Sequence, residues 1–152
     1  MKTVIMAGGF GTRLRPLTQN LPKPMVPVAN LPMLHHVINL LNRHSLSDCV
    51  VLLYFQPEEI KSYFKDGSEF GIAMQYLSAE EDLGTAGSVK NAESLFKDER
   101  ILVISGDVLT DFDLTAAIEF HIAKKATATM VLTRLENPLS YGVVITDQEG
   151  RI

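Results

Sequence analysis

The chain has 152 residues, of which 46% are hydrophobic and 21% are charged, a balance typical of one folded domain and not of a disordered chain. Its formal net charge of −4 argues against nucleic acid and anionic membranes as partners. The single cysteine, Cys49, excludes an intrachain disulfide, and no run approaches the roughly 18 apolar residues of a membrane span, so we expect a cytoplasmic protein.

The first predicted element is a β-strand over residues 3–6, whose β-branched side chains suit a pleated sheet. A glycine-rich loop follows, with Gly8, Gly9 and Gly11 close together. Residues without a Cβ let the main chain turn sharply and let an anion approach its N–H groups. A polyphosphate suits such a loop best, although a plain tight turn is the alternative for the glycines alone.

Two cations follow the glycines. Arg13 comes just after them, and Lys23 lies further along, between Pro22 and Pro24. Arginine offers a planar fork for phosphate oxygens, whereas lysine offers a compact charge on a flexible stem. The prolines restrict the backbone around Lys23 and so reduce the freedom that it would lose on binding. We therefore predict that the loop binds phosphates.

Two better-known phosphate-binding motifs are absent from this stretch. In the dinucleotide fingerprint G-x-G-x-x-G, the third glycine would fall where Arg13 and Leu14 stand. The acidic residue that binds a ribose about 20 positions later is missing as well. No Gly-Lys-Ser/Thr closes the loop, so it is not a P-loop. A nicotinamide-dependent oxidoreductase is therefore a weak alternative.

Helix and strand patterns alternate along the rest of the chain. Helices are predicted at 32–44, from Pro57 to a stop at Gly67, at 84–96, and after Asp113 as an N-cap. Strands are predicted at 49–55, 71–77, 101–105, 126–134 and 141–146. The buried face of the first helix is predicted to contain Met33, Val37, Leu40, Leu41 and His44. This alternation predicts an α/β fold, an open and mostly parallel sheet with helices on both faces, in one domain over residues 1–152.

The run AGGFGTRLRPLT, followed by PKPMVP, closely resembles the signature of the sugar-phosphate nucleotidyltransferases, which make nucleotide-sugars from a nucleoside triphosphate and a sugar 1-phosphate. The LGTAG at 83–87 and the SGD at 105–107 fall where that family has its second and third motifs. LGTAG is most similar to the mannose-1-phosphate guanylyltransferase branch. Catalytic domains of the family are longer than this chain, so the resemblance implies the N-terminal, truncated part of a Rossmann-like nucleotidyltransferase fold.

The resemblance also implies roles for individual residues. Arg13 and Lys23 would be catalytic, Arg13 at the β- and γ-phosphates and Lys23 at the α-phosphate. Asp107 would hold Mg²⁺, the implied cofactor; from the residues alone, a carboxylate at a strand end suits a magnesium site and a turn equally well. The nucleotide would be bound by Ala7, Gly8, Gly9, Gly11, Thr12, Arg13, Glu80, Gly84 and Thr85.

Three acidic residues, Glu80, Glu81 and Asp82, precede the LGTAG motif. One carboxylate can accept both adjacent donors of guanine, N1–H and the 2-amino group, and neither adenine nor uracil offers such a pair. Family members often have one further residue here, commonly a proline, so the sequence leaves open which carboxylate faces the base. A solvated acidic turn is the alternative.

The predicted reaction is in-line attack of mannose 1-phosphate on the α-phosphorus of GTP, with release of pyrophosphate. A uridylyl- or adenylyltransferase acting on glucose 1-phosphate and a non-catalytic nucleotide-binding module are the alternatives. The expected partners are thus a nucleoside triphosphate and a sugar 1-phosphate, with a homo-oligomer as an option. Only two residues follow the predicted strand 141–146 and its turn at 147–150, so we expect an open strand edge, self-association, weak Mg²⁺-nucleotide binding and little transferase activity.

Overall fold

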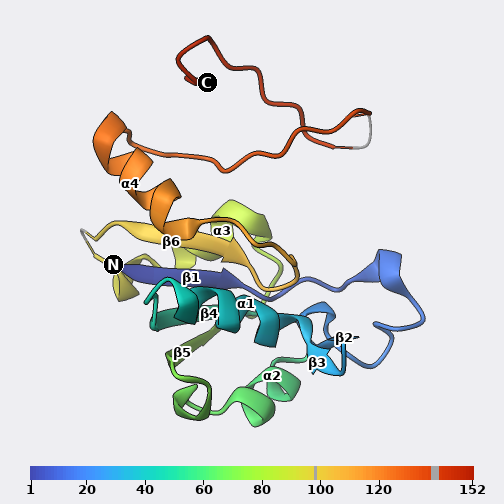
Figure 1. Ribbon diagram of the computed structural model, residues 1–152. Coiled ribbons are helices and arrows are strands. Elements are labelled where there is room, and N and C mark those ends of the chain that lie inside the picture. The colour runs from blue at the N-terminus through green and yellow to red at the C-terminus, as the bar shows by residue number, and fades with distance from the viewer. Residues whose placement is uncertain (98, 138–140) are drawn as a thin grey trace. The chain divides into compact units, whose positions relative to one another are not determined.

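A computed structural model of the chain describes residues 1–97, 99–137 and 141–152, which divide into two compact units, Met1–Leu114 and Thr115–Ile152 (Figure 1). The first unit is built on a parallel sheet with the strand order β5-β4-β1-β6. Its strands are β1 (Lys2–Met6), β4 (Asp48–Leu53), β5 (Ala73–Ser78) and β6 (Ile101–Ser105). Two short strands, β2 (Pro27–Val28) and β3 (Leu31–Pro32), form a separate antiparallel pair. The predicted open, parallel α/β sheet is therefore confirmed.

Helices connect the strands of this sheet. They are α1 (Met33–Arg43), α2 (Pro57–Phe64) and α3 (Gly84–Asn91), and α4 (Leu114–Lys124) follows β6. Short 3₁₀ turns lie elsewhere in the connections: η1 (Thr12–Leu14), η2 (Lys23–Met25), η3 (Ser68–Phe70) and η4 (Glu93–Leu95). In Figure 1, α1 and α3 lie on opposite faces of the sheet, as predicted. No helix in the described part of the chain is both long and apolar enough to span a membrane.

The central strands β1 and β4 bury both of their faces. Val4 of β1 pairs in register with Val50 of β4, and both pack with Ala92 on the α3 side of the sheet. Successive strand residues point to opposite faces, so Ile5 and Val51 project toward the other side, and both are fully buried there. The edge strand β6 differs from the expected buried strand, because Val103 is 41% exposed.

The buried face of α1 is wider than predicted. It consists of Leu34, Val37, Ile38, Leu40 and Leu41. Met33 and His44 were expected on this face, and both are only partly buried. The helix begins at Met33 and ends before His44, so neither residue lies within the central turns that contact the core.

The predicted helix 84–96 is interrupted. α3 ends at Asn91, and the buried Ala92 leads into η4 through i→i+3 hydrogen bonds, with Ala92 N–H donating to Val89 O and Leu95 N–H donating to Ala92 O. The side chains predicted to face inward, Val89, Ala92, Leu95 and Phe96, do pack in the core. The break therefore changes the path of the backbone and leaves the buried face as predicted.

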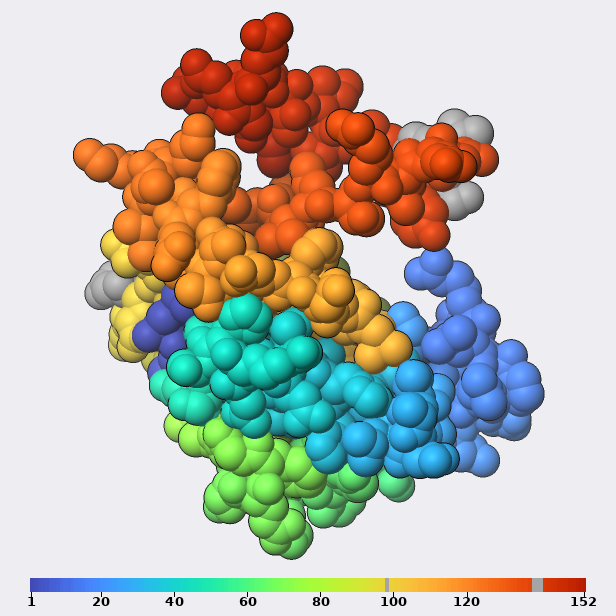
Figure 2. Space-filling model, viewed as in Figure 1, coloured from blue at the N-terminus to red at the C-terminus, as the bar shows by residue number. Residues whose placement is uncertain are grey.

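The strands predicted at 126–134 and 141–146 are wrong: the described residues there form no strand. A strand exists only where its N–H and C=O groups meet a partner, and no described residue pairs with these segments. The predicted turn at 147–150 does form, with Gly150 N–H donating to Asp147 O (3.1 Å) and Asp147 N–H donating to Arg151 O (2.9 Å). Figure 2 shows this C-terminal segment in dark red.

Candidate functional site

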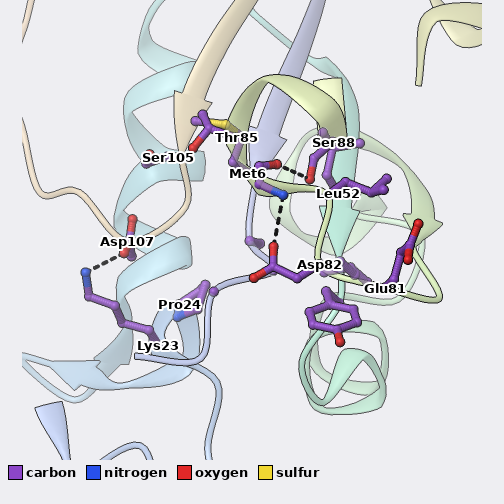
Figure 3. A pocket seen from close by; sticks show the side chains of 17 residues that line it. Met6, Lys23, Pro24, Leu52, Glu81, Asp82, Thr85, Ser88, Ser105 and Asp107 are labelled. Atoms are coloured by element: carbon purple, nitrogen blue, oxygen red, sulfur yellow. Dashed lines mark hydrogen bonds and ion pairs between the residues drawn. The ribbon is translucent and has the colours of Figure 1, made fainter. Parts of the chain in front are cut away.

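A pocket of about 290 Å³ opens at the carboxyl edge of the parallel sheet, within the unit Met1–Leu114 (Figure 3). Its walls come from residues at or just after the ends of β1, β4 and β6, and from the first turn of α3. In open α/β sheets this edge is the usual place for a ligand. The pocket brings together seven of the predicted site residues: Ala7, Gly8, Gly9, Lys23, Gly84, Thr85 and Asp107.

The hydrogen-bond ladder of the sheet extends into the pocket wall. Ala7 N–H donates to Leu52 O (2.9 Å), and Gly106 N–H donates to Met6 O (2.8 Å). Each of these donors lies one residue beyond the end of its strand. The ladder therefore fixes the points at which the glycine loop and the Asp107 loop leave the sheet.

Two glycines of the loop occupy positions where a side chain would be crowded or strained. A Cβ on Gly8 would lie 3.1 Å from the Cβ of Tyr54, because the loop passes tightly over the end of β4. Gly11 has a φ of +63°, and a Cβ there would lie 2.9 Å from Cγ2 of Thr18. The hydroxyl of the buried Thr18 donates to Gly11 O (2.7 Å). Thr18 thus anchors the loop, a role that no local sequence pattern predicts.

An aromatic contact also holds the glycine loop in place. The ring of Phe10 meets Tyr54 edge-on, with centroids 5.4 Å apart, and lies 5.3 Å from the ring of Phe55. Phe55 N–H donates to Gly8 O (3.3 Å) on the same side. Edge-to-face ring pairs of this kind add about 0.5–1.5 kcal/mol to the burial of their area. The loop is therefore fixed against the chain that leaves β4, and Tyr54 also lines the pocket.

Lys23 and Asp107 meet directly across the pocket (Figure 3), with Nζ 2.5 Å from Oδ2. Both side chains are partly buried, 31% and 25% exposed. The backbone of Lys23 is held in η2, where Pro22 is the N-cap and Met25 N–H donates to Pro22 O (2.8 Å). The sequence predicted a role for each of these two residues, and the structure adds that they form an ion pair.

The start of α3 forms the opposite wall. Asp82 Oδ1 accepts the N–H of Gly84 (2.9 Å), and the hydroxyl of Ser88 donates to Gly84 O (2.6 Å). Glu81 and Asp82 both line the pocket, whereas Glu80 does not, and all three are exposed. An acidic residue just before a helix is the pattern that points to Asp82, since carboxylates favour helix N-termini.

The remaining predicted residues lie outside the pocket lining. Gly11 shapes the loop without lining the pocket. Thr12 and Arg13 belong to η1, where both are exposed. A long arginine side chain can reach a phosphate that extends beyond the cavity. The contact of Arg13 with the nucleotide therefore stays a prediction.

The charges around the pocket are unbalanced. The described lining residues include three carboxylates, Glu81, Asp82 and Asp107, and a single cation, Lys23. No group of three or more His, Cys, Asp or Glu side chains in the described chain is arranged to hold a metal ion. Asp107 fits a hard cation such as Mg²⁺ nonetheless, because that ion binds through one or two carboxylates and takes its other ligands from phosphates and water.

The chain is similar to known proteins over almost its whole length. The family model described as Nucleotidyl transferase matches residues 2–152. The mannose-1-phosphate guanylyltransferase of Mycobacterium tuberculosis is 36% identical, with 98% of this chain and 42% of that protein covered. The UTP--glucose-1-phosphate uridylyltransferase of Synechocystis is 39% identical, with coverage of 100% and 42%. The chain thus spans 42% of the length of these relatives.

Solved structures of other proteins have the same fold as this chain. A putative glucose-1-phosphate thymidylyltransferase from Bacillus anthracis, in complex with a sucrose, superposes with a TM-score of 0.76 at 28% identity. The match covers 82% of this chain and 51% of that one. HddC from Yersinia pseudotuberculosis, complexed with GMP-PN, gives a TM-score of 0.72 at 28% identity, with coverage of 80% and 54%.

Proposed function

Because the chain belongs to the nucleotidyl transferase family, we propose that its pocket binds a nucleoside triphosphate for transfer of the nucleoside monophosphate to a sugar 1-phosphate, with release of pyrophosphate. The observation that carries this proposal is the meeting of Lys23 and Asp107 beside the glycine loop at the carboxyl edge of the sheet. The favoured substrates are GTP and mannose 1-phosphate, after the M. tuberculosis relative. The Synechocystis relative makes UTP and glucose 1-phosphate the second candidates.

The protein contributes position and charge more than bond-making groups. The main chain at Gly8 and Gly9 lies open to the pocket and receives the phosphates. Lys23 neutralises charge that develops at the α-phosphate as the sugar phosphate attacks in line, and Arg13 holds the outer phosphates. Asp107 would hold Mg²⁺, which supplies charge neutralisation and orients the phosphate oxygens. No covalent enzyme intermediate is required.

Base recognition belongs to the wall that contains Glu81 and Asp82. Asp82 already accepts the N–H of Gly84, so Glu81 has the freer carboxylate for the two donors of guanine. We expect Glu81→Gln to weaken GTP binding by about tenfold, because a buried donor left with a poorer acceptor costs about 1–3 kcal/mol. ATP and UTP should bind as before, and Glu80→Gln, outside the pocket, is the matched control.

Calorimetric titration of the chain with Mg²⁺ and GTP, UTP or ATP tests the proposal. We expect one nucleotide to bind best and Arg13→Ala to lose most of that affinity. Lys65→Ala should not, because Lys65 forms an exposed ion pair with Glu69 and does not line the pocket. Pyrophosphate release by a complete enzyme with this N-terminal region, tested with several sugar 1-phosphates, then separates a transferase from a non-catalytic nucleotide-binding module. Failure to bind any triphosphate would refute the proposed function.

In a complete enzyme with this N-terminal region, Lys23→Ala should reduce kcat by about 10²–10³, the loss typical of one preorganised charge-stabilising donor. Arg13→Ala should mainly weaken triphosphate affinity. Normal turnover by either variant would contradict the role assigned to that residue.

A further inference from the structure

We infer that Lys23 is the resident counter-cation of Asp107, so that the pocket takes up a divalent cation only together with the phosphates of a nucleotide. The inference rests on the proposed function, because it assumes that Asp107 is the metal ligand. It adds an order to the binding events: the nucleotide and its metal ion enter as one complex, and the lysine changes partner as they arrive.

The ion pair itself is the first observation. Lys23 Nζ lies 2.5 Å from Asp107 Oδ2, a direct contact between opposite charges. A metal ion bound to the same oxygen would need the space that the ammonium group occupies, and the two positive charges would repel each other. Partial burial of both side chains strengthens this competition, since screening by water is reduced there.

The charge of the pocket is the second observation. Of the described lining residues, Glu81, Asp82 and Asp107 are anionic and only Lys23 is cationic. With Lys23 engaged by Asp107, a bare triphosphate meets a surface with an excess of negative charge. A triphosphate that carries its divalent cation has much of its charge cancelled, and it can enter such a pocket more readily.

The exchange needs only a side chain to move. The backbone of Lys23 is fixed by Pro22, Pro24 and the hydrogen bond from Val26 N–H to Lys23 O (3.1 Å). Its flexible four-carbon stem can swing the ammonium from Asp107 to a phosphate oxygen. The carboxylate of Asp107 is then free for the metal ion that the phosphates bring. Each charge leaves one partner only when another is present.

Titration of the nucleotide-free chain with Mn²⁺, followed by the electron paramagnetic resonance signal of the free ion, tests this inference. We expect wild type to bind Mn²⁺ weakly and Lys23→Met to bind it about tenfold more tightly, because the competing ammonium is gone. Lys23→Arg should behave as wild type, since it keeps a cation beside Asp107. Lys65→Met, which opens the exposed Lys65–Glu69 pair instead, is the matched control and should show no gain.

The double variant Lys23→Met, Asp107→Asn should lose the gain if Mn²⁺ binds where the lysine was. Thermal unfolding of each variant confirms that the compared proteins are folded. Equal Mn²⁺ affinity of Lys23→Met and wild type would overturn the inference, and so would a gain that persists without the Asp107 carboxylate. Nucleotide binding is read separately by calorimetry, so loss of the proposed function and loss of this exchange are distinguishable.

Discussion

At the scale of single residues, Gly11 links the parts of the glycine loop. Its carbonyl accepts the Thr18 hydroxyl, and its missing side chain leaves room for the stem of Lys23, whose Cβ would lie 3.1 Å from a Cβ on Gly11. One glycine thus sets both the path of the loop and the position of the only cation among the described pocket residues. Its neighbour Gly9 has open space around it.

We expect Gly11→Ala to destabilise the chain by about 1–3 kcal/mol, because an L-residue at positive φ is strained and its methyl group would clash with Thr18. Nucleotide affinity should fall with it. Gly9→Ala is the control: it has no positive φ and nothing within 4 Å, so its cost should stay within about 0.5 kcal/mol. Urea unfolding of both variants measures the difference, and equal stabilities would contradict the constraint assigned to Gly11.

Cys49 gives a pH-dependent prediction. Burial, with the nearby Asp48 carboxylate, raises the pKa of the Cys49 thiol from 9.0 to about 12, and Lys2 opposes the shift weakly. The folded state therefore prefers the neutral thiol: this stabilisation is fully present below pH 9 and is lost as the pH rises toward 12. At pH 8 the native chain should resist iodoacetamide, and the urea-unfolded chain should react, as mass spectrometry would show. Fast alkylation of the native chain would contradict the burial of this thiol.

At the scale of elements, the strongest apolar patterns predicted real structure. β4 lies almost where the run at 49–55 placed it, because a strand buried on both faces needs a continuous apolar sequence. The segments 126–134 and 141–146 have similar strand-forming residues, yet no strand forms in their described parts. Pairing depends on a partner strand, and a segment's own residues do not say whether the partner is present. β2 and β3 are too short for any periodicity to show.

Only part of the candidate site could likewise be predicted from the sequence. Local patterns pointed to the glycines, to Lys23 and to Asp107, because a glycine-rich turn and a carboxylate at a strand end can be recognised from adjacent residues. Thr18 acts through a contact with Gly11, seven residues earlier, and Tyr54 through a contact with the distant Gly8, and nothing next to them indicates those contacts. The Lys23–Asp107 ion pair likewise arises only when η2 and the end of β6 come together.

The end of α2 supplies a test at this scale. Phe64 is fully buried, and its ring contacts Tyr63, His35 and Phe70. Phe64→Ala should cost about 3–5 kcal/mol through lost burial and the cavity left behind. Phe120→Ala on α4, where the ring is 49% exposed, should cost far less. Denaturant unfolding of both variants makes the comparison, and a small loss at Phe64 would mean that α2 contributes little to the core.

At the scale of the whole molecule, the pocket belongs to one unit, and the two most exposed of the large apolar side chains, Ile145 and Ile152, belong to the other. All the pocket residues lie within Met1–Leu114. The unit Thr115–Ile152 exposes many large apolar side chains, among them Met130, Val143 and Ile145, the last 83% exposed. Extended apolar backbone without a strand partner is a template for pairing with another chain.

We therefore expect the 152-residue chain to self-associate as its concentration rises. Val143→Asp with Ile145→Asp should shift the population toward monomer, because charges on an exposed segment oppose pairing. Gln148→Glu adds a charge in the adjacent turn and should change little. Multi-angle light scattering gives the molar masses. A wild-type chain that stays monomeric at all concentrations would show that the exposed segment does not mediate self-association.

The extension of the sheet ladder to Ala7 and Gly106 has a consequence for hydrogen exchange. These two amides are bonded to neighbouring strands, so they exchange with deuterium only when the sheet opens. The exposed backbone at Gly9 and Phe10 exchanges from the folded state. Without a ligand, the amides of Ala7 and Gly106 should therefore exchange slowly and those of Gly9 and Phe10 quickly. A bound triphosphate should slow exchange at Gly9 and Phe10 and leave exchange at Ala7 and Gly106 unchanged. Exchange rates at single residues would then report whether the pocket is occupied.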